Sequence, residues 1–203
     1  MEGILDGVIE EEEQIHYLTT ISRQTERLNK LVEELDVLTL NAQPQIESDG
    51  EAEIVFLDQL LIEVMSEFQL LIEREERDIY IQVSPESAKI KSHYDKLSRI
   101  LLNLLNNAFK YSDPGTKIEI VAQLTEQILT ISVKDEGRGI APENLDKIFK
   151  RLYRVETSRN MKTGGHGLGL AIARELAHQL GGEITVESQY GLGSTFTFTL
   201  NLT

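Results

Sequence analysis

The sequence predicts an α+β protein in which a long N-terminal helical segment precedes a domain of helices and a mixed β-sheet. Two observations predict this class. Apolar residues recur at helical spacing through residues 15–40, and after residue 51 short alternating runs are interspersed with longer helical runs. With 203 residues and 40% hydrophobic side chains, the chain is long enough to bury a substantial core.

The N-terminal segment carries a heptad pattern. Apolar or near-apolar residues occur alternately three and four positions apart at Ile15, Leu18, Ile21, Thr25, Leu28, Val32, Leu35 and Thr39. Residues 1–9 have the pattern of the end of a preceding helix, so we expect a dimerising helical hairpin; a helix packed on its own domain is the alternative. Pro, Gly, amide and acidic residues at 41–51 indicate a linker, which divides the chain into domains 1–46 and 47–203.

The second domain alternates between strand and helix patterns. Strands are expected at residues 52–56, 79–83, 89–92, 117–124, 127–134, 183–188 and 194–201. Helices are expected at residues 58–77, 95–111, 143–149 and from about 168 to 180. The run 89–92 is expected to pair beside 79–83.

The composition excludes several classes of function. The chain holds 20 Lys and Arg against 34 Asp and Glu, and the formal charge of −14 argues against nucleic acid or an anionic membrane as its main partner. The absence of cysteine excludes disulfides, thiolate metal sites and cysteine nucleophiles. No stretch resembles a signal peptide or the ~20 apolar residues of a membrane span, so we expect a cytoplasmic segment without membrane contact.

Three closely spaced glycines lead directly into the last predicted helix. Gly165, Gly167 and Gly169 occur in residues 163–173, TGGHGLGLAIA. Without a Cβ their backbone can approach a ligand closely, and the helix that begins near Leu168 directs free N–H groups toward it. The stretch predicts a phosphate site, with a tight packing turn as the alternative.

One face of the helix at residues 95–111 is polar although the rest is apolar. Asn103, Asn107 and Lys110 lie at i, i+4 and i+7 on that face. Burying an amide without a partner costs about 1–3 kcal/mol. These side chains therefore need a ligand, an ion or one another, and a set of mutually bonded asparagines is the alternative to a ligand site.

Two further stretches lie between that helix and the glycines. Asp135-x-Gly137-x-Gly139 follows a strand, where the aspartate can accept a hydrogen bond from an amino group; a simple tight turn is the alternative. Residues 147–162 lack a clear period and hold six basic residues against one acid, namely Lys147, Lys150, Arg151, Arg154, Arg159 and Lys162. In so acidic a chain this segment predicts a lid over a polyphosphate, with a solvated loop as the alternative.

In this order the motifs resemble those of the catalytic ATP-binding domain of bacterial sensor histidine kinases. Asn103–Ser112 is similar to the N box of that family, Asp135–Gly139 to the G1 box, Ile148–Arg154 to the F box and Gly165–Leu170 to the G2 box. The resemblance implies an α/β sandwich of the histidine-kinase ATPase type, with a mixed sheet that carries its helices on one face. It covers nearly the whole chain, because residues 15–40 resemble the second dimerisation helix of the family.

The resemblance also implies ATP and Mg²⁺ as cofactors and gives roles to individual residues. The implied catalytic residues are Asn103, Asn107 and Lys110. Asn107, together with Asn103, would hold Mg²⁺. Lys110 and Arg154 would contact phosphate oxygens. The implied cofactor-binding residues are Tyr111, Asp135, Gly137, Gly139, Arg154, Gly165, Gly167, Leu168 and Gly169. Among them, Asp135 would bind the adenine amino group and Tyr111 would lie against the nucleoside.

The sequence departs from the family at the phosphoacceptor. The family's acceptor histidine lies in a motif resembling H-E-[LF]-R-T-P, which this sequence does not contain, and His16 lacks such surroundings. We therefore expect the acceptor to lie upstream of Met1 in a longer protein, and we expect this chain alone not to phosphorylate itself.

Position 103 separates related functions. In relatives such as gyrase and the heat-shock chaperone ATPases a glutamate that activates water is expected there. Asn103 cannot take a proton, so an ATP hydrolase is disfavoured.

A sensor histidine kinase implies a homodimer through the N-terminal helices, a response-regulator receiver domain as partner, and the cytosolic portion of a membrane-bound sensor. The alternative is a nucleotide-binding or serine-directed kinase module of the anti-sigma-factor type, which would not require the long helical seam.

Overall fold

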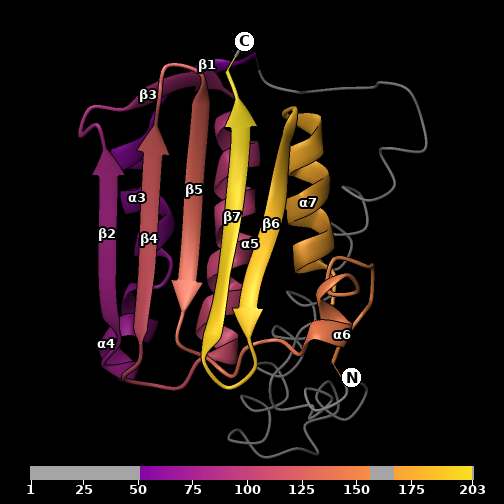
Figure 1. Ribbon diagram of the computed structural model, residues 1–203. Helices are drawn as coiled ribbons and strands as arrows, with labels where there is room; N and C mark the ends of the chain where they lie inside the picture. The colour runs from indigo at the N-terminus through magenta and orange to yellow at the C-terminus, as the bar shows by residue number, and fades with distance from the viewer. Residues whose placement is uncertain (1–50, 156–166, 203) are drawn as a thin grey trace, which may run out of the picture. The chain divides into compact units, whose positions relative to one another are not determined.

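The computed structural model of the chain describes residues 51–155 and 167–202 (Figure 1). The chain divides into two units, Met1–Ile46 and Glu47–Thr203. The predicted dimerisation helices at residues 1–46 lie outside the described residues, so the fold reported below is that of the second unit. No helix within the described ranges is long and apolar enough to cross a membrane.

A five-stranded sheet forms the body of this unit (Figure 1). Its strands, in spatial order, are β2 (Asp78–Ser84), β4 (Lys117–Leu124), β5 (Ile128–Asp135), β7 (Gly193–Asn201) and β6 (Gly182–Gln189). β2 pairs with β4 in parallel, whereas the other neighbouring pairs are antiparallel. The predicted mixed sheet is confirmed, and each of these strands begins and ends within one residue of its predicted bounds.

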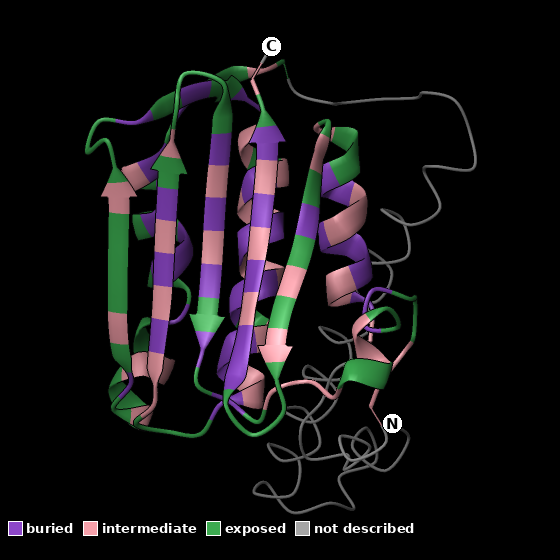
Figure 2. Ribbon diagram, viewed as in Figure 1, coloured by how far each residue is buried: buried purple, intermediate pink, exposed green. Residues whose placement is uncertain are grey.

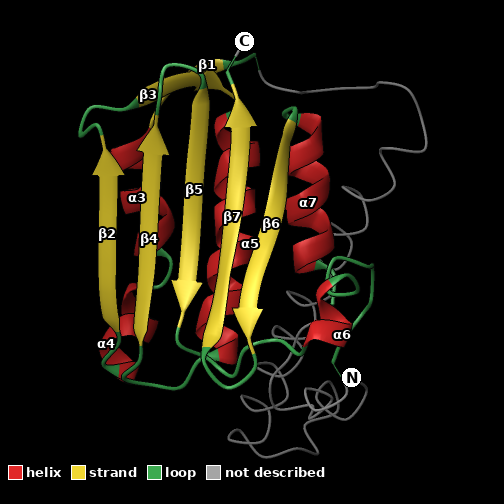
Figure 3. Cartoon of the chain, in the orientation of Figure 1, coloured by secondary structure: helices red, strands yellow, loops and turns green. Residues whose placement is uncertain are grey.

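Helices cover one face of the sheet (Figure 3). These are α3 (Leu57–Ser66), α4 (Gln69–Glu75), α5 (Tyr94–Tyr111) and α7 (Gly169–Gln179), while the single turn α6 (Pro142–Leu145) lies near the end of β6. α5 runs behind the middle of the sheet and packs against α7, which also contacts β6. The expected arrangement, with the helices on one face, is confirmed.

The core lies between this helical layer and the sheet. Buried and partly exposed residues alternate along β5 and β7, because successive side chains of a strand point to opposite faces (Figure 2). The buried apolar residues of these two strands are Leu129, Ile131, Val133, Phe196, Phe198 and Leu200, and the buried polar pair Asp135 and Ser194 lies at one end. The other side is rich in threonine and serine, which is typical of an antiparallel sheet with one solvated face.

The helix expected over residues 58–77 is broken at Glu67 and Phe68 into α3 and α4. The break lets Phe68 stack on Phe109 of α5, with ring centroids 4.7 Å apart and ring planes 5° from parallel. Phe68 and Phe109 are both buried. This packing outweighs the helical propensity of a stretch that contains neither Gly nor Pro.

The strand β3 (Lys89–Ser92) was expected beside β2, and this expectation is wrong. β3 pairs instead with β1 (Glu53–Phe56) in a separate antiparallel pair. Val55 and Ile90 are partners in that pair and both are buried, so the pair closes one end of the core. The burial of Val55 and Ile90 decides which strands pair, and the short sequences of β1 and β3 do not reveal this burial.

Candidate functional site

α5 presents the polar face that its sequence predicts. Asn103, Asn107 and Lys110 are all half-buried on a helix whose other side is buried. Asn103 Nδ2 donates to Arg99 O at 2.8 Å, and the exposed Asn106 donates to a carbonyl of its own helix. Within the described part of the chain the asparagines do not bond to one another, and Asn107 makes no side-chain hydrogen bond. The structure therefore does not show the mutually bonded asparagines that were the alternative to a ligand site.

Asp135 is a buried carboxylate at the end of β5. The residue is 5% exposed, and its Oδ1 accepts a hydrogen bond from Gly137 N at 2.8 Å. Burial raises the pKa of Asp135 above its ordinary value, while the backbone N–H groups of Gly137 and Ser194 act in the opposite direction because they stabilise the carboxylate. A buried carboxylate with a perturbed pKa marks a candidate functional position.

The loop that follows Asp135 packs directly on the end of α5. Arg138 N donates to Tyr111 O at 3.1 Å, and a Cβ built on Gly137 would lie 2.3 Å from the same carbonyl oxygen. A side chain at position 137 would therefore push the loop away from the helix. The predicted N box and G1 box, which are distant in sequence, form one continuous wall.

Two cations lie over the aromatic ring of Tyr111. Lys110 Nζ is 5.1 Å from the ring centroid and Arg138 Cζ is 4.4 Å from it. Each such contact is worth about 0.5–1 kcal/mol at an exposed site. A flat aromatic surface with two positive charges beside it suits a nucleotide, which joins a flat base to anionic phosphates.

The start of α7 contacts the opposite end of the polar face of α5. A Cβ built on Gly169 would lie 2.8 Å from Asn103 Oδ1, so only glycine lets this amide come so close. The helix begins at Gly169 after the buried Leu168, and among the described residues no side chain caps its first N–H groups. These groups form the positive end of the helix dipole, which favours an anion.

Gly167 joins the predicted G2 box to the predicted F box. Leu152 N donates to Gly167 O at 3.0 Å, and a Cβ built on Gly167 would lie 2.7 Å from Tyr153 O. Gly167 also has a φ of +73°, which glycine adopts readily. The first part of the predicted lid segment, residues 147–155, therefore contacts the G2 box here, whereas Gly165 and the rest of residues 156–166 lie outside the described residues.

Phe149 anchors the F box in the core. Its ring meets Phe196 edge-on with centroids 6.4 Å apart, and its carbonyl oxygen accepts a hydrogen bond from Arg174 at 3.3 Å. The helix expected at residues 143–149 ends early, at Leu145, because the chain turns to bring Phe149 inward. Arg154, at the other end of the box, is half-buried beside Gly167.

Two contributors to this site have no clear signal in the sequence. Arg138 occupies a variable position of the Asp-x-Gly-x-Gly pattern, so nothing in the pattern predicts its contact with Tyr111. Gly193 follows a turn that reads only as a hairpin, yet a Cβ built on it would lie 2.0 Å from Asp135 O. The φ of +121° at Gly193 is the physical reason for glycine there.

Comparisons with known proteins agree with this geometry. Residues 92–203 match the family of histidine kinase-, DNA gyrase B- and HSP90-like ATPases. The histidine protein kinase SaeS of Staphylococcus epidermidis is 39% identical over 203 residues, which covers 98% of this chain. The chain spans 56% of the length of SaeS.

Solved structures of histidine kinases share the fold. Full-length ShkA in complex with AMPPNP aligns with a TM-score of 0.79 at 27% identity, over 93% of this chain and 38% of ShkA. The histidine kinase AdeS of Acinetobacter baumannii aligns with a TM-score of 0.75 at 27% identity, over 98% of this chain and 90% of the AdeS chain. The chain therefore belongs to the family of histidine kinase-, DNA gyrase B- and HSP90-like ATPases, and within it to the bacterial sensor histidine kinases.

Proposed function

We propose that this chain is the ATP-binding portion of a two-component sensor histidine kinase. It binds Mg·ATP between α5, the loop after Asp135 and the start of α7, and it presents the γ-phosphate to a histidine of a dimerisation helix. The histidine nitrogen attacks the γ-phosphorus, ADP leaves, and an aspartate of a response-regulator receiver domain then takes the phosphoryl group. The protein acts as a homodimer through its N-terminal helices and is the cytosolic portion of a membrane-bound sensor.

One observation carries the proposal: contacts link all four motifs to one another along α5. The N box contacts the G1 box through Tyr111 O, and it contacts the G2 box through Asn103 Oδ1. The G2 box in turn bonds to the F box through Gly167 O. These contacts among four stretches that are separated in sequence support a binding site over simple turns and packing.

The residues at this place fit the chemical groups of Mg·ATP. The buried carboxylate of Asp135 can accept from an exocyclic amino group, and the ring of Tyr111, which Lys110 and Arg138 approach, would lie against the nucleoside. The uncapped N–H groups of α7 and the ammonium of Lys110 suit phosphate oxygens. Asn107, together with Asn103, would hold Mg²⁺ by amide oxygen; bound there, the ion neutralises phosphate charge.

Asn103 supports transfer to a protein over transfer to water. An amide cannot take the proton of a water molecule, so the site lacks a general base at this position and needs a nucleophile from elsewhere. The relative SaeS carries the name histidine protein kinase, and ShkA was solved with a nucleotide analogue, which agrees with this choice. A serine-directed module is disfavoured, because the match to SaeS covers 98% of the chain, including its N-terminal segment.

Calorimetric titration of the chain with ATP, with and without Mg²⁺, tests the site. We expect Asn107→Ala to weaken Mg·ATP binding by about tenfold, or ~1.4 kcal/mol, and to lose most of the Mg²⁺ dependence. Asn106→Ala is the matched control, because Asn106 is the neighbouring exposed asparagine of the same helix and should bind as the wild type. Normal Mg²⁺-dependent binding by Asn107→Ala would show that the site is assigned wrongly.

Incubation with ATP labelled at the γ-phosphate tests the kinase activity. We expect little acid-labile phosphate on this chain and clear labelling of a longer protein that includes an upstream acceptor histidine. Strong labelling of this chain at His16 would contradict the proposal, since it would place the acceptor on the second helix.

A further inference from the structure

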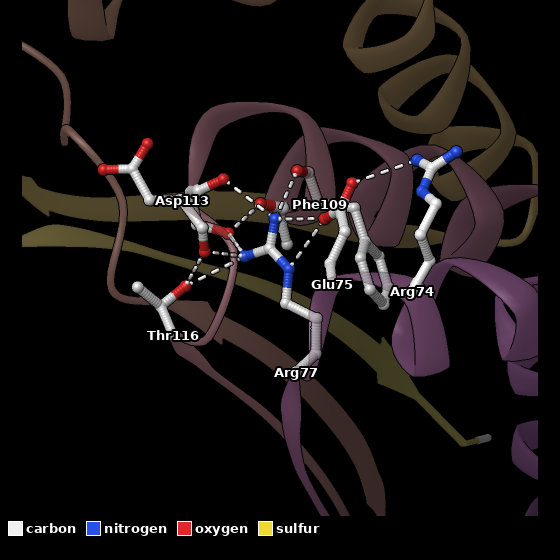
Figure 4. A network of polar contacts seen from close by, with 8 residues as sticks. Arg74, Glu75, Arg77, Phe109, Asp113 and Thr116 are labelled. Carbon is white, nitrogen blue, oxygen red and sulfur yellow. Dashed lines mark hydrogen bonds and ion pairs between the residues drawn. The ribbon is translucent and has the colours of Figure 1, made fainter.

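Arg77 is a buried arginine outside the four motifs. It follows α4, and its side chain is 1% exposed. Figure 4 shows its polar contacts. Nη1 donates to Ser112 Oγ at 2.7 Å, to Thr116 Oγ1 at 2.9 Å and to the carbonyl oxygen of Asp113. Nη2 donates to Phe109 O at 3.2 Å and to Ser112 O at 2.9 Å. One guanidinium thus binds five oxygen atoms at the end of α5 and in the turn that follows it.

These oxygens include groups that a helix end leaves without partners. The last four carbonyls of an α-helix have no intrahelical donor, and the C-terminal end of the helix dipole is negative. α5 ends at Tyr111, and Arg77 supplies both donors and positive charge there. Its guanidinium also lies 5.7 Å from the centroid of the Phe109 ring, which is stacked on Phe68.

Glu75 makes this burial of a charge possible. Its Oε2 accepts from Arg77 Nη2 at 2.8 Å and from Nε at 3.0 Å, which is a two-point ion pair. The hydrogen bond from Arg77 is the main reason that the pKa of Glu75 lies below its ordinary value. The Glu75 carbonyl also accepts from Gly115 N at 2.8 Å, so the same residue holds the turn after α5.

The atoms that Arg77 binds flank the residues of the proposed site. Phe109 and Ser112 lie on either side of Lys110 and Tyr111 in the chain. Tyr111 O lies in the chain between the Phe109 and Ser112 carbonyls that Arg77 binds. It accepts from Arg138 N, and the loop after Asp135 packs on it. A change in the path of the chain at 109–113 would therefore move the wall of the site directly.

We infer that Arg77 is a positioning residue for nucleotide binding, which fixes the end of α5 so that Tyr111 and the loop after Asp135 meet at the correct distance. The inference rests on the proposed function, since it assigns a role toward the same site. Arginine is required because its planar fork reaches several oxygens in fixed directions, whereas the single ammonium of lysine cannot replace both Nη groups.

The test compares Arg77→Lys and Arg77→Met with the matched variants Arg74→Lys and Arg74→Met. Arg74 also pairs with Glu75, at 3.2 Å, but its side chain is 74% exposed and, among the described residues, has no hydrogen bond to α5. Thermal melting shows which variants fold, calorimetry gives the affinity for Mg·ATP, and the backbone amide resonance of Arg138 reports its hydrogen bond to Tyr111 O. The resonance is the measurement that a purely structural role elsewhere in the fold would leave unchanged.

We expect folded Arg77→Lys to bind Mg·ATP about tenfold more weakly, equivalent to ~1.4 kcal/mol, and to show a shifted Arg138 amide resonance. Arg77→Met should lose at least as much, and both Arg74 variants should match the wild type in both measurements. A folded Arg77→Lys with wild-type affinity and an unmoved resonance would overturn the inference.

If both Arg77 variants fail to fold, Thr116→Val decides the question, since it removes one acceptor of Arg77 and leaves the arginine in place. A smaller loss of affinity with a shifted Arg138 resonance supports the positioning role, and no change in either overturns it. If the wild type itself does not bind Mg·ATP, the proposed function fails, and the Arg138 resonance alone still tests whether Arg77 fixes the end of α5.

Discussion

Replacing Asp135 by asparagine should separate nucleotide recognition from stability. In the wild type, Gly137 N donates to Asp135 Oδ1 at 2.8 Å. The substitution keeps the shape of the side chain and an oxygen that can accept this hydrogen bond. It replaces the second carboxylate oxygen by an NH₂ group, which opposes the amino group of adenine with a donor. The variant therefore loses one hydrogen bond to a charged acceptor while the loop geometry is retained.

The size of the loss follows from the burial of the site. A hydrogen bond to a charged group contributes about 1.5–3 kcal/mol, which corresponds to a decrease in affinity of roughly 10- to 150-fold. Because Asp135 is only 5% exposed, water cannot easily replace the lost acceptor, and the upper part of this range is expected. Asp146→Asn, a change at an exposed aspartate, is the control and should bind as the wild type.

Stability should change in the opposite direction. Burial raises the pKa of Asp135 above 3.8, so between 3.8 and that raised value the folded state holds a proton that the unfolded state has lost. The carboxylate therefore destabilises the wild type as pH rises through this window, and the penalty is complete at neutral pH. Asp135→Asn should be at least as stable as the wild type at pH 7, and this advantage should disappear below pH 3.8.

Calorimetry with Mg·ATP and urea unfolding at several pH values measure both effects. The affinity of the wild type should also fall as pH decreases through the raised pKa, because protonation removes the acceptor, whereas Asp135→Asn should lack this part of the pH dependence. Binding of Mg·ATP by Asp135→Asn as tight as that of the wild type would show that the carboxylate does not bind the base.

Two further predictions concern the packing around the site. Gly137→Ala should lower the affinity for Mg·ATP and destabilise the protein by about 1–3 kcal/mol, since its Cβ would lie 2.3 Å from Tyr111 O; calorimetry and urea unfolding measure the two, and an unchanged affinity would refute the contact. For Glu75, whose pKa is lowered from 4.5 by Arg77, the stabilisation is present above pH 4.5 and is lost as pH falls through the lowered value. The free energy of unfolding of Glu75→Gln should therefore depend less on pH in this range than that of the wild type, and equal slopes would contradict the role of the ion pair.

Much of the fold could be predicted because its local patterns agree with its tertiary structure. β4, β5 and β7 alternate between buried and solvated side chains, and this is the signal that a half-buried antiparallel strand leaves in a sequence. α5 was equally clear, since its helix ends just before a Pro-Gly turn. In these elements no distant contact overrides the local preference.

The parts that could not be predicted depend on contacts between distant residues. The break before α4 follows from the stacking of Phe68 on Phe109, and these residues are separated by 41 positions in the sequence. The pairing of β3 with β1 follows from the joint burial of Val55 and Ile90. Arg77 lies in a stretch of charged residues, EREERD, in which nothing distinguishes the arginine that is buried from Arg74, which is exposed.

The candidate site shows a related limit, because each motif glycine has two readings in the sequence. Gly169 was expected either to admit a phosphate or only to pack tightly, and it does meet Asn103 Oδ1 closely. Likewise, a side chain at position 137 would clash with Tyr111 O, and one at position 193 would clash with Asp135 O. These contacts position the amide, the carboxylate and the end of α5 that the proposed ligand requires. Packing and ligand approach are therefore compatible explanations here, because the glycines that pack closely also bring together the residues of the proposed site.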